Sequence, residues 1–259
     1  MPLFRGGAIS VDQSLLNVGR SRTGRVGFGG SYTRTSGAGS TASASFGSGS
    51  YSINLSAGTA SGGHGKTGWY DPIETYLQGG ASTIDYSKRI RFSIHGAMYI
   101  GSTNSRIRIL FGGTGNATDA PFANQNGLTV KGFGVEFALQ SGLIQGRLIG
   151  FNSAYLTPTS YTSLTNGFGD SAADNRYFAC MIESDGTGNI YLYGANSSTT
   201  PNMVINPVPL LTLTGGPTSA TSSNRFGPEI QCVNDSTVTP TSSRSAELQS
   251  FSSWILDVS

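Results

Sequence analysis

The sequence predicts an all-β protein, an antiparallel β-sandwich with an extended N-terminal arm. Three observations lead to this fold class. Charged residues make up only 12% of the chain, while Gly, Thr, Phe and Tyr are abundant, as is typical of sheets and turns. Several short segments alternate between apolar and polar residues, which is the period of a strand. The first 66 residues, by contrast, are basic and rich in Gly and Ser.

The strands of the sandwich are predicted from about residue 83 onwards. Apolar side chains occupy every second position in 89–95, 106–111 and 130–139, as expected for strands with one buried face. Turn-forming clusters such as 101–105 separate these runs, which favours a sandwich or barrel. Later candidate strands read GRLIGFNSAYL, NRYFACMIES, NIYLYGA, RFGPEIQCV and SFSSWILDV. The last of them is expected to pair with an early strand and close the sheet.

The arm is predicted to span residues 1–66 and the sandwich domain residues 67–259. The arm holds six basic residues and one acid, a net charge of +5 in a chain whose total is +2. So little apolar surface cannot offset the chain entropy lost on ordering, and we expect neighbouring subunits to hold the arm. The alternative is that the arm folds back as an edge strand of its own domain. The candidate partner-binding residues are Arg5, Arg20, Arg22, Arg25 and Arg34.

The spacing of these arginines bears on the kind of partner. They are spread over some thirty residues without dense basic clusters, which makes nucleic acid an unlikely partner. An acidic protein surface suits this density better, because a guanidinium forms forked pairs with carboxylates.

The segment RYFACMIESDGTGNIYLYGANSS resembles a recurring hairpin of concanavalin A-like (laminin-G/pentraxin-like) jelly rolls. In that family a strand ends in an acidic-Gly turn and is followed by a strand of the type G-x-I-x-L-Y-x-N-G. The matching residues here are Gly188, Ile190, Leu192, Tyr193 and Gly194. The resemblance spans about residues 83–259 and implies a concanavalin A-like jelly roll, without implying a particular ligand.

The Gly/Ser-rich arm, the low charge and the lack of an apolar signal in MPLFRGGAIS resemble a virion surface protein of a tailed bacteriophage. This resemblance implies a non-enzymatic virion structural protein, for capsid decoration or associated with the tail, made in the host cytoplasm. Its expected partners are capsid or tail subunits and copies of itself, a trimer by analogy. The alternative is a carbohydrate-binding receptor-recognition module, as in a tail fibre or lectin, for a host-surface glycan. No run is long and apolar enough to predict a membrane span.

Motifs for catalysis are not found in the sequence. Glycosidases of this fold class set paired carboxylates on one strand in an E-x-D-x-x-E pattern. Glu136 is the nearest candidate, but residues 138 and 140 are Ala138 and Gln140 and the carboxylate pairing is absent, so we interpret Glu136 as solvated or ion-paired. The two histidines, His64 and His95, are not part of a nucleophile motif. The sequence therefore predicts a protein without enzymatic activity, catalytic residues or cofactor.

Cys180 and Cys232 both lie in apolar, strand-like runs. Cysteine is among the most buried residue types, so we expect two buried free thiols, with a disulfide between them left open. Together with two distant histidines they do not have the spacing of a zinc site.

Two loops carry the oxygen ligands that calcium prefers. The candidate ligands are Asp170 and Asp174 in the first loop and Asp185 and Asn189 in the second. Asp, Asn and Gly are also the commonest turn formers, and this interpretation is favoured because a D-x-D-x-D pattern is missing. No metal site is therefore predicted, and calcium remains the minor alternative.

Tyrosines supply the candidates for glycan binding, because exposed aromatic rings stack on sugars. Tyr155 and Tyr161, in FNSAYLTPTSYTSLTN, are the two candidate residues. Tyr191 and Tyr193 alternate on one strand. We favour the interpretation that their rings pack against the core while their hydroxyl groups contact water.

Overall fold

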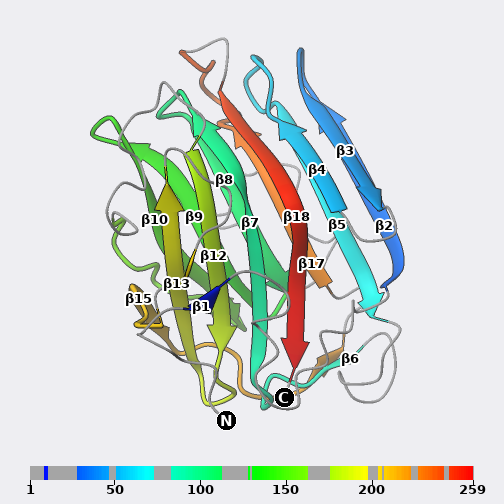
Figure 1. The fold of residues 1–259 in the computed structure, drawn as a ribbon, viewed down its shortest axis with the longest axis vertical. Coiled ribbons are helices and arrows are strands. Elements are labelled where there is room, and N and C mark those ends of the chain that lie inside the picture. The colour runs from blue at the N-terminus through cyan, green and yellow to red at the C-terminus, as the bar shows by residue number, and fades with distance from the viewer. Residues whose placement is uncertain are drawn as a thin grey trace.

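The structure is a computed structural model that describes residues 9–10, 28–46, 51–72, 83–112, 128, 130–162, 176–197, 204–205, 207–222, 227–241 and 245–258. These residues form two seven-stranded antiparallel sheets packed face to face (Figure 1). The described segments contain no helix, and therefore none long and apolar enough to cross a membrane. The predicted antiparallel β-sandwich is confirmed.

Each sheet combines strands from distant parts of the chain. The first sheet has the order β11 (Ala154–Tyr155), β10 (Leu143–Asn152), β9 (Gly132–Gln140), β8 (Ser105–Gly112), β17 (Gly227–Asn234), β5 (His64–Pro72) and β2 (Phe28–Ser36). The second has the order β15 (Leu211–Thr214), β13 (Asn189–Ser197), β12 (Arg176–Ser184), β7 (Ile90–Ile100), β18 (Ala246–Val258), β4 (Tyr51–Ser56) and β3 (Thr41–Phe46). Two short pairs lie apart from them: β1 (Ile9–Ser10) with β14 (Val204–Ile205), and β6 (Thr83–Ile84) with β16 (Thr221–Ser222).

Apolar side chains from both sheets meet in one core. Ile107, Ile109 and Phe111 of β8 are fully buried in this core, as the alternating pattern predicts. Successive side chains of a strand point to opposite faces, so Arg106 and Arg108 point away from the core. The outward face of the first sheet is thus the place where its charged side chains gather.

Most of the region predicted as a free arm belongs to the sandwich. β2 pairs with β5 at the edge of the first sheet, and the hairpin β3–β4 pairs with β18 in the second. The predicted boundary at residue 66 falls inside β5 and is corrected, because the structure has the alternative in which the segment folds back on its own domain. Arg34 lies on exposed β2, whereas Arg5, Arg20, Arg22 and Arg25 lie outside the described residues.

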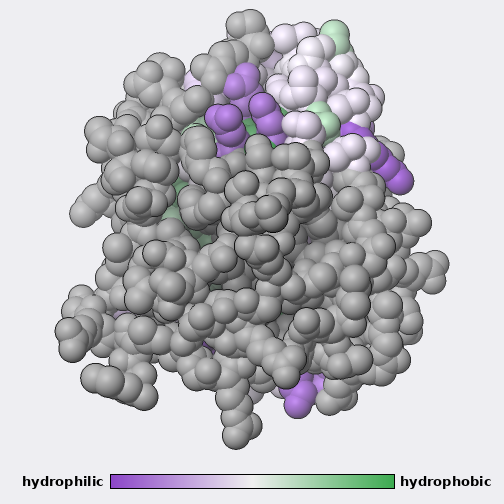
Figure 2. All heavy atoms as spheres, turned by 45° about the vertical axis from the view of Figure 1, so that its right-hand side comes forward, coloured by the Kyte–Doolittle hydropathy of each residue, from purple (hydrophilic) through white to green (hydrophobic). Residues whose placement is uncertain are grey.

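Small residues allow the two sheets to meet closely at this edge. A Cβ on Gly65 would lie 2.1 Å from the carbonyl oxygen of Thr41 in the opposite sheet, so only glycine fits there. Ile53 and Leu55 of β4 fill the core beside it with fully buried side chains. Figure 2 brings this edge forward and shows that its described residues are mostly of near-neutral hydropathy (white), with a few hydrophilic ones (purple).

The hairpin β12–β13, on which the jelly-roll resemblance depends, is present as predicted. Its strands pair in register from Tyr177 opposite Ser197 to Ser184 opposite Ile190. Gly186 and Gly188 in the turn have φ angles of +82° and +97°, a region that favours glycine. β18 lies between β7 and β4, which confirms that the last strand pairs with earlier ones. It does not close the second sheet, because β18 is an interior strand and β15 and β3 form the edges.

Candidate functional site

A row of polar residues crosses six strands on the outward face of the first sheet. The registers of neighbouring strands place one residue of each strand opposite the next. We call this set the polar row; from β10 to β2 it consists of Arg147, Glu136, Arg108, Gln231, Lys66 and Arg34. Opposite charges stand side by side at its β10 end, where direct cross-strand pairs stabilise a sheet.

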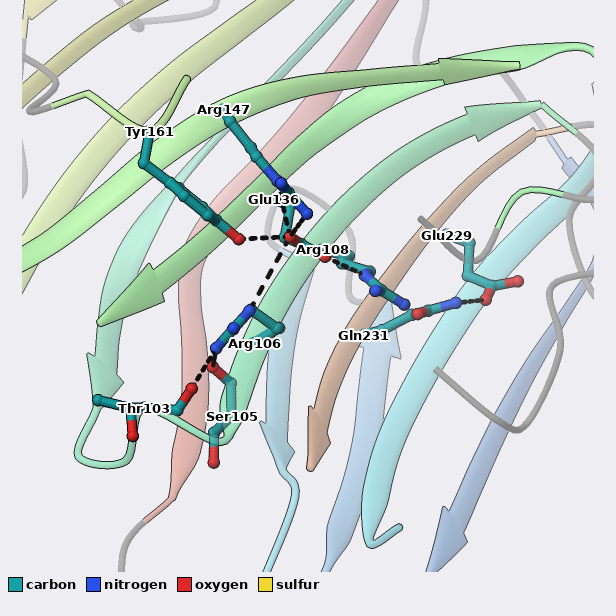
Figure 3. A network of polar contacts seen from close by, with 9 residues as sticks. All are labelled: Thr103, Ser105, Arg106, Arg108, Glu136, Arg147, Tyr161, Glu229 and Gln231. Carbon is teal, nitrogen blue, oxygen red and sulfur yellow. Dashed lines mark hydrogen bonds and ion pairs between the residues drawn. The ribbon is translucent and has the colours of Figure 1, made fainter. Parts of the chain in front are cut away.

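Glu136 is the centre of the charged end of the polar row (Figure 3). Its Oε2 accepts a hydrogen bond from Arg108 Nε at 2.7 Å. Its Oε1 lies 2.7 Å from Arg147 Nη2 and 3.9 Å from Arg106 Nε, and it accepts a hydrogen bond from the Tyr161 hydroxyl at 2.5 Å. Glu136 and Arg108 are each only 1% exposed. The prediction of an ion-paired Glu136 is confirmed, while its exposure to solvent is not, because this face of the sheet is buried here.

These contacts fix the protonation states of the cluster. Burial by itself raises the pKa of Glu136, but the charges of Arg108 and Arg147 and the Tyr161 hydrogen bond outweigh it and hold the pKa below its usual value. Burial and the Glu136 charge both raise the pKa of Tyr161, whose hydroxyl therefore stays protonated as a donor. Glu136 is thus a carboxylate at neutral pH that positions donors, and it does not carry the proton of a general acid.

The next member of the polar row after Arg108 is Gln231, whose side chain contacts the buried Glu229 beside the row. Gln231 Nε2 donates a hydrogen bond to Glu229 Oε1, and both residues are at most 2% exposed. Gln231 Oε1 is buried and has no hydrogen-bond partner within the described part of the chain. Figure 3 shows this end of Gln231 directed toward Arg108, away from Glu229.

Tyr161 reaches the polar row because its segment runs beside β10. Gly146 and Thr162 form a bridge, and Thr159 N donates to Leu148 O at 3.2 Å. Arg147 CZ lies 4.5 Å from the centroid of the Tyr161 ring, a cation–π distance. The side chain of Arg147 is 25% exposed, so this stacked pair is the accessible part of the cluster.

Tyr155, the second predicted tyrosine, lies at the edge of the same face. It pairs with Phe151 of β10, and the two rings pack edge to face with centroids 5.1 Å apart. Tyr155 is 37% exposed. Phe151 also packs on a small apolar cluster of this face, formed by Leu110, Leu128 and Ile149. The structure therefore brings both tyrosines to β10, one beside the arginines and one beside this apolar cluster.

Asp185 and Asn189, the candidate ligands of the minor calcium alternative, are used by the turn of the β12–β13 hairpin. Asp185 accepts hydrogen bonds from the backbone N–H of Thr187 at 2.8 Å and from Asn189 Nδ2 at 2.8 Å. Burial acts to raise the pKa of Asp185, but the hydrogen bonds of Asn189 and Thr187 lower it to about 2. Among the described residues no three His, Cys, Asp or Glu side chains converge as metal ligands. Asp170 and Asp174 lie outside the described residues.

The two cysteines are buried free thiols, as predicted. Burial raises the pKa of both thiols, so neither is a thiolate at neutral pH. His64 Nδ1 lies 3.3 Å from the Gly62 carbonyl oxygen, a local contact of the β4–β5 connection. His95 is in β7, and its side chain is outside the described part of the structure.

The sequence did not single out Arg106, Arg108, Arg147 and Gln231 as site residues. Arg106 and Arg108 alternate with Ile107 and Ile109, which indicated that they share a face. This alternation did not indicate that Glu136 lies opposite Arg108, because a one-residue change of register moves every side chain to the other face. Cross-strand register was therefore the information needed to find the site.

No protein-family model matches the sequence, and no curated protein matches it. Solved structures do resemble the chain. A protein of unknown function from Shewanella oneidensis MR-1 shares 9% identity, over 88% of this chain and 78% of that one, with a TM-score of 0.46. The GH16 protein of the Bacteroides ovatus mixed-linkage glucan PUL, with its G4G4G3G product, shares 12% identity, over 90% and 98%, with a TM-score of 0.44. The metal-free carbohydrate recognition domain of Emp46p shares 10% identity, over 84% and 86%, with a TM-score of 0.41. At such identities the likeness concerns the fold alone, the two-sheet β-sandwich already described, and it says nothing about the function of the chain.

The prediction of a protein without enzymatic activity is corrected by these comparisons. Besides the GH16 protein, similar structures are titled as a beta-1,3-glucanase from Mycobacterium marinum and an alginate lyase from Pseudomonas aeruginosa. Proteins titled as enzymes are thus among the similar structures, and the missing carboxylate motif at Glu136 does not exclude enzymatic activity. The titles name glycan-related proteins and do not support the expected virion role. That role, its capsid or tail partners and the oligomeric state remain predictions.

Proposed function

We propose that the chain is a carbohydrate-binding protein and that the outward face of its first sheet, along β10, holds the sugar. One observation carries this proposal. Arg147 is held by Glu136 on one side and stacked on the Tyr161 ring on the other, while a quarter of its side chain stays exposed. A donor group and an aromatic ring are thereby fixed at an accessible point of the face.

Fixed donors are what sugar recognition requires. A sugar presents several hydroxyl groups and one less polar ring face, so its sites combine a few placed polar groups with aromatic surface. The ion pair with Glu136 and the cation–π contact restrict the Arg147 side chain before any ligand arrives. Less side-chain entropy is then lost on binding, which raises affinity without additional contacts.

The aromatic pair of Tyr155 and Phe151 supports the proposal from the same strand. Phe151 lies four residues beyond Arg147 on β10 and points to the same face, roughly 13 Å away at about 3.3 Å per residue. This spacing is longer than one sugar unit. We therefore propose that the exposed ring of Tyr155 stacks on one unit of an oligosaccharide while a different unit of the same chain contacts Arg147.

The test is a glycan array probed with the full chain, followed by calorimetric titration of the glycans that bind. Tyr155→Ala should weaken binding about fivefold, since one aromatic contact contributes about 1 kcal/mol. Tyr191→Ala is the matched control, because Tyr191 is a partly exposed tyrosine of the second sheet. An array without any selective signal, or equal losses in the two variants, would contradict the proposal.

A further inference from the structure

The ion pairs around Glu136 bring several guanidinium groups to one carboxylate. Three guanidinium groups, those of Arg106, Arg108 and Arg147, lie within 4 Å of a single carboxylate. Both oxygens of that carboxylate already accept hydrogen bonds, from Arg108 at Oε2 and from Arg147 and Tyr161 at Oε1. Glu136 is therefore engaged within the cluster, and the donors of Arg147 that it does not use are the groups left to consider.

Arg147 is the member of this cluster that can contact a ligand. Its Nε and Nη2 face Glu136, at 3.0 Å and 2.7 Å. A guanidinium has five N–H groups, so Nη1 and the second N–H of Nη2 remain. These groups have no acceptor among the described residues, and the side chain is 25% exposed.

The remaining donors of Arg147 lie in one plane, because the guanidinium is rigid and flat. Two parallel N–H groups match the two oxygens of a carboxylate, which makes the bidentate pair both stronger and more directional than a bond to a neutral hydroxyl. The Tyr161 ring below the guanidinium keeps that plane in place. A planar anionic group on the ligand is the chemistry that these donors fit best.

We infer that the ligand is an acidic saccharide, a glycan whose sugars carry carboxylate groups, and that Arg147 binds one of these carboxylates. The inference rests on the proposed function and adds the substrate class. A uronate places its carboxylate on the sugar ring itself. One sugar unit can therefore pair with Arg147 while another unit of the same chain stacks on Tyr155.

The experiment compares one polyuronate oligosaccharide in two forms, native and carboxyl-reduced, by calorimetric titration against the full chain. The two forms differ only in the charged group, so their affinities isolate its contribution. We expect the native form to bind about tenfold to a hundredfold more tightly, as for a hydrogen bond to a charged group. A neutral β-glucan oligosaccharide and a sulfated oligosaccharide of equal length complete the series.

Two variants of Arg147 sharpen the comparison. Arg147→Gln should reduce binding of the native form to the level of the reduced form, and Arg147→Lys should restore only part of it, because lysine keeps the charge but loses the planar fork. Arg89→Gln, which changes a 48% exposed arginine immediately before β7, should leave both affinities unchanged. Thermal unfolding of each variant verifies that the fold is intact.

The outcomes separate the inference from the proposed function. Tighter binding of the native form, lost in Arg147→Gln, supports the inference. Equal binding of native, reduced and neutral glycans overturns it while the proposed function stands. Preference for the sulfated oligosaccharide, or equal binding of a single-stranded oligonucleotide, overturns the choice of a carboxylate. Binding of none of these glycans, together with a blank array, overturns the proposed function and this inference with it.

Discussion

Arg147 and Glu136 stand directly opposite each other on β10 and β9, with Arg147 Nη2 2.7 Å from Glu136 Oε1. The pair joins a buried carboxylate to a partly exposed guanidinium. On its inner side Glu136 neutralises Arg108, which is buried. On its outer side it orients Arg147 toward a ligand. The same carboxylate therefore serves both the stability of the sheet and the proposed recognition of a saccharide.

Replacing Glu136 with Gln should destabilise the protein strongly. The substitution breaks the buried ion pair between Glu136 and Arg108, and breaking a buried pair costs about 3 to 5 kcal/mol. Denaturant unfolding monitored by circular dichroism measures this loss of unfolding free energy. Glu183→Gln is the control, because its partners Arg89 and Arg91 are more exposed and the cost should be about 1 kcal/mol or less. Equal losses of unfolding free energy in the two variants would contradict the central role of Glu136 in its cluster.

Removing the hydroxyl group of Tyr161 should cost stability without removing the ring from Arg147. Tyr161→Phe deletes the hydrogen bond to the charged Glu136, which contributes about 1.5 kcal/mol. In Tyr155→Phe the lost hydroxyl has no hydrogen bond among the described residues, so the free energy of unfolding should change little. The same unfolding experiment compares the two. An equal effect in both variants would argue against the Tyr161–Glu136 bond.

The β12–β13 turn should weaken in acid through Asp185. Its pKa is lowered from 3.8 to about 2 in the folded chain, so its ionised form stabilises the fold above about pH 4 and loses this effect as the pH falls toward 2. Asp185→Asn should therefore be less stable than the wild type at pH 7, and the difference should shrink between pH 4 and pH 2. Urea unfolding at several pH values measures it. A difference that stays constant down to pH 2 would contradict the assignment.

Truncation should reveal where the folded unit begins. Removal of residues 1–66 deletes β1 to β4 and the start of β5, which leaves β18 without its partner β4 and β17 with only part of its pairing to β5. We expect this variant to lose its cooperative unfolding transition, whereas removal of residues 1–27 should preserve it. Scanning calorimetry distinguishes the two. A cooperative transition in the protein that lacks residues 1–66 would support a domain boundary at residue 66.

The sequence supports prediction of elements whose own side chains carry the pattern. Strands β7, β8 and β9 were predicted because one face of each is apolar in strict alternation. The β12–β13 hairpin was predicted because Gly188 and its neighbours specify the turn and the following strand. β2 and β3 were missed because Ser, Thr, Ala and Gly show no such pattern, and their pairing depends on β5 and β4 instead.

The candidate site was predictable only in part. Tyr155 and Tyr161 stood out as aromatic residues in a polar loop, and the structure places both beside β10. Glu136 stood out as an acid among apolar neighbours, but its partners Arg108 and Arg147 come from two other strands. Their meeting depends on sheet order and register, which are tertiary properties that local periodicity does not contain.

The proposed saccharide site is tested most directly by titrating one bound oligosaccharide into the wild type, Arg147→Gln and Arg89→Gln. Both variants remove one positive charge, but only Arg147 lies on the outward face of the first sheet. The proposed site requires a large loss of affinity for Arg147→Gln and wild-type affinity for Arg89→Gln. Unchanged affinity in a folded Arg147→Gln, or the larger loss in Arg89→Gln, would contradict it.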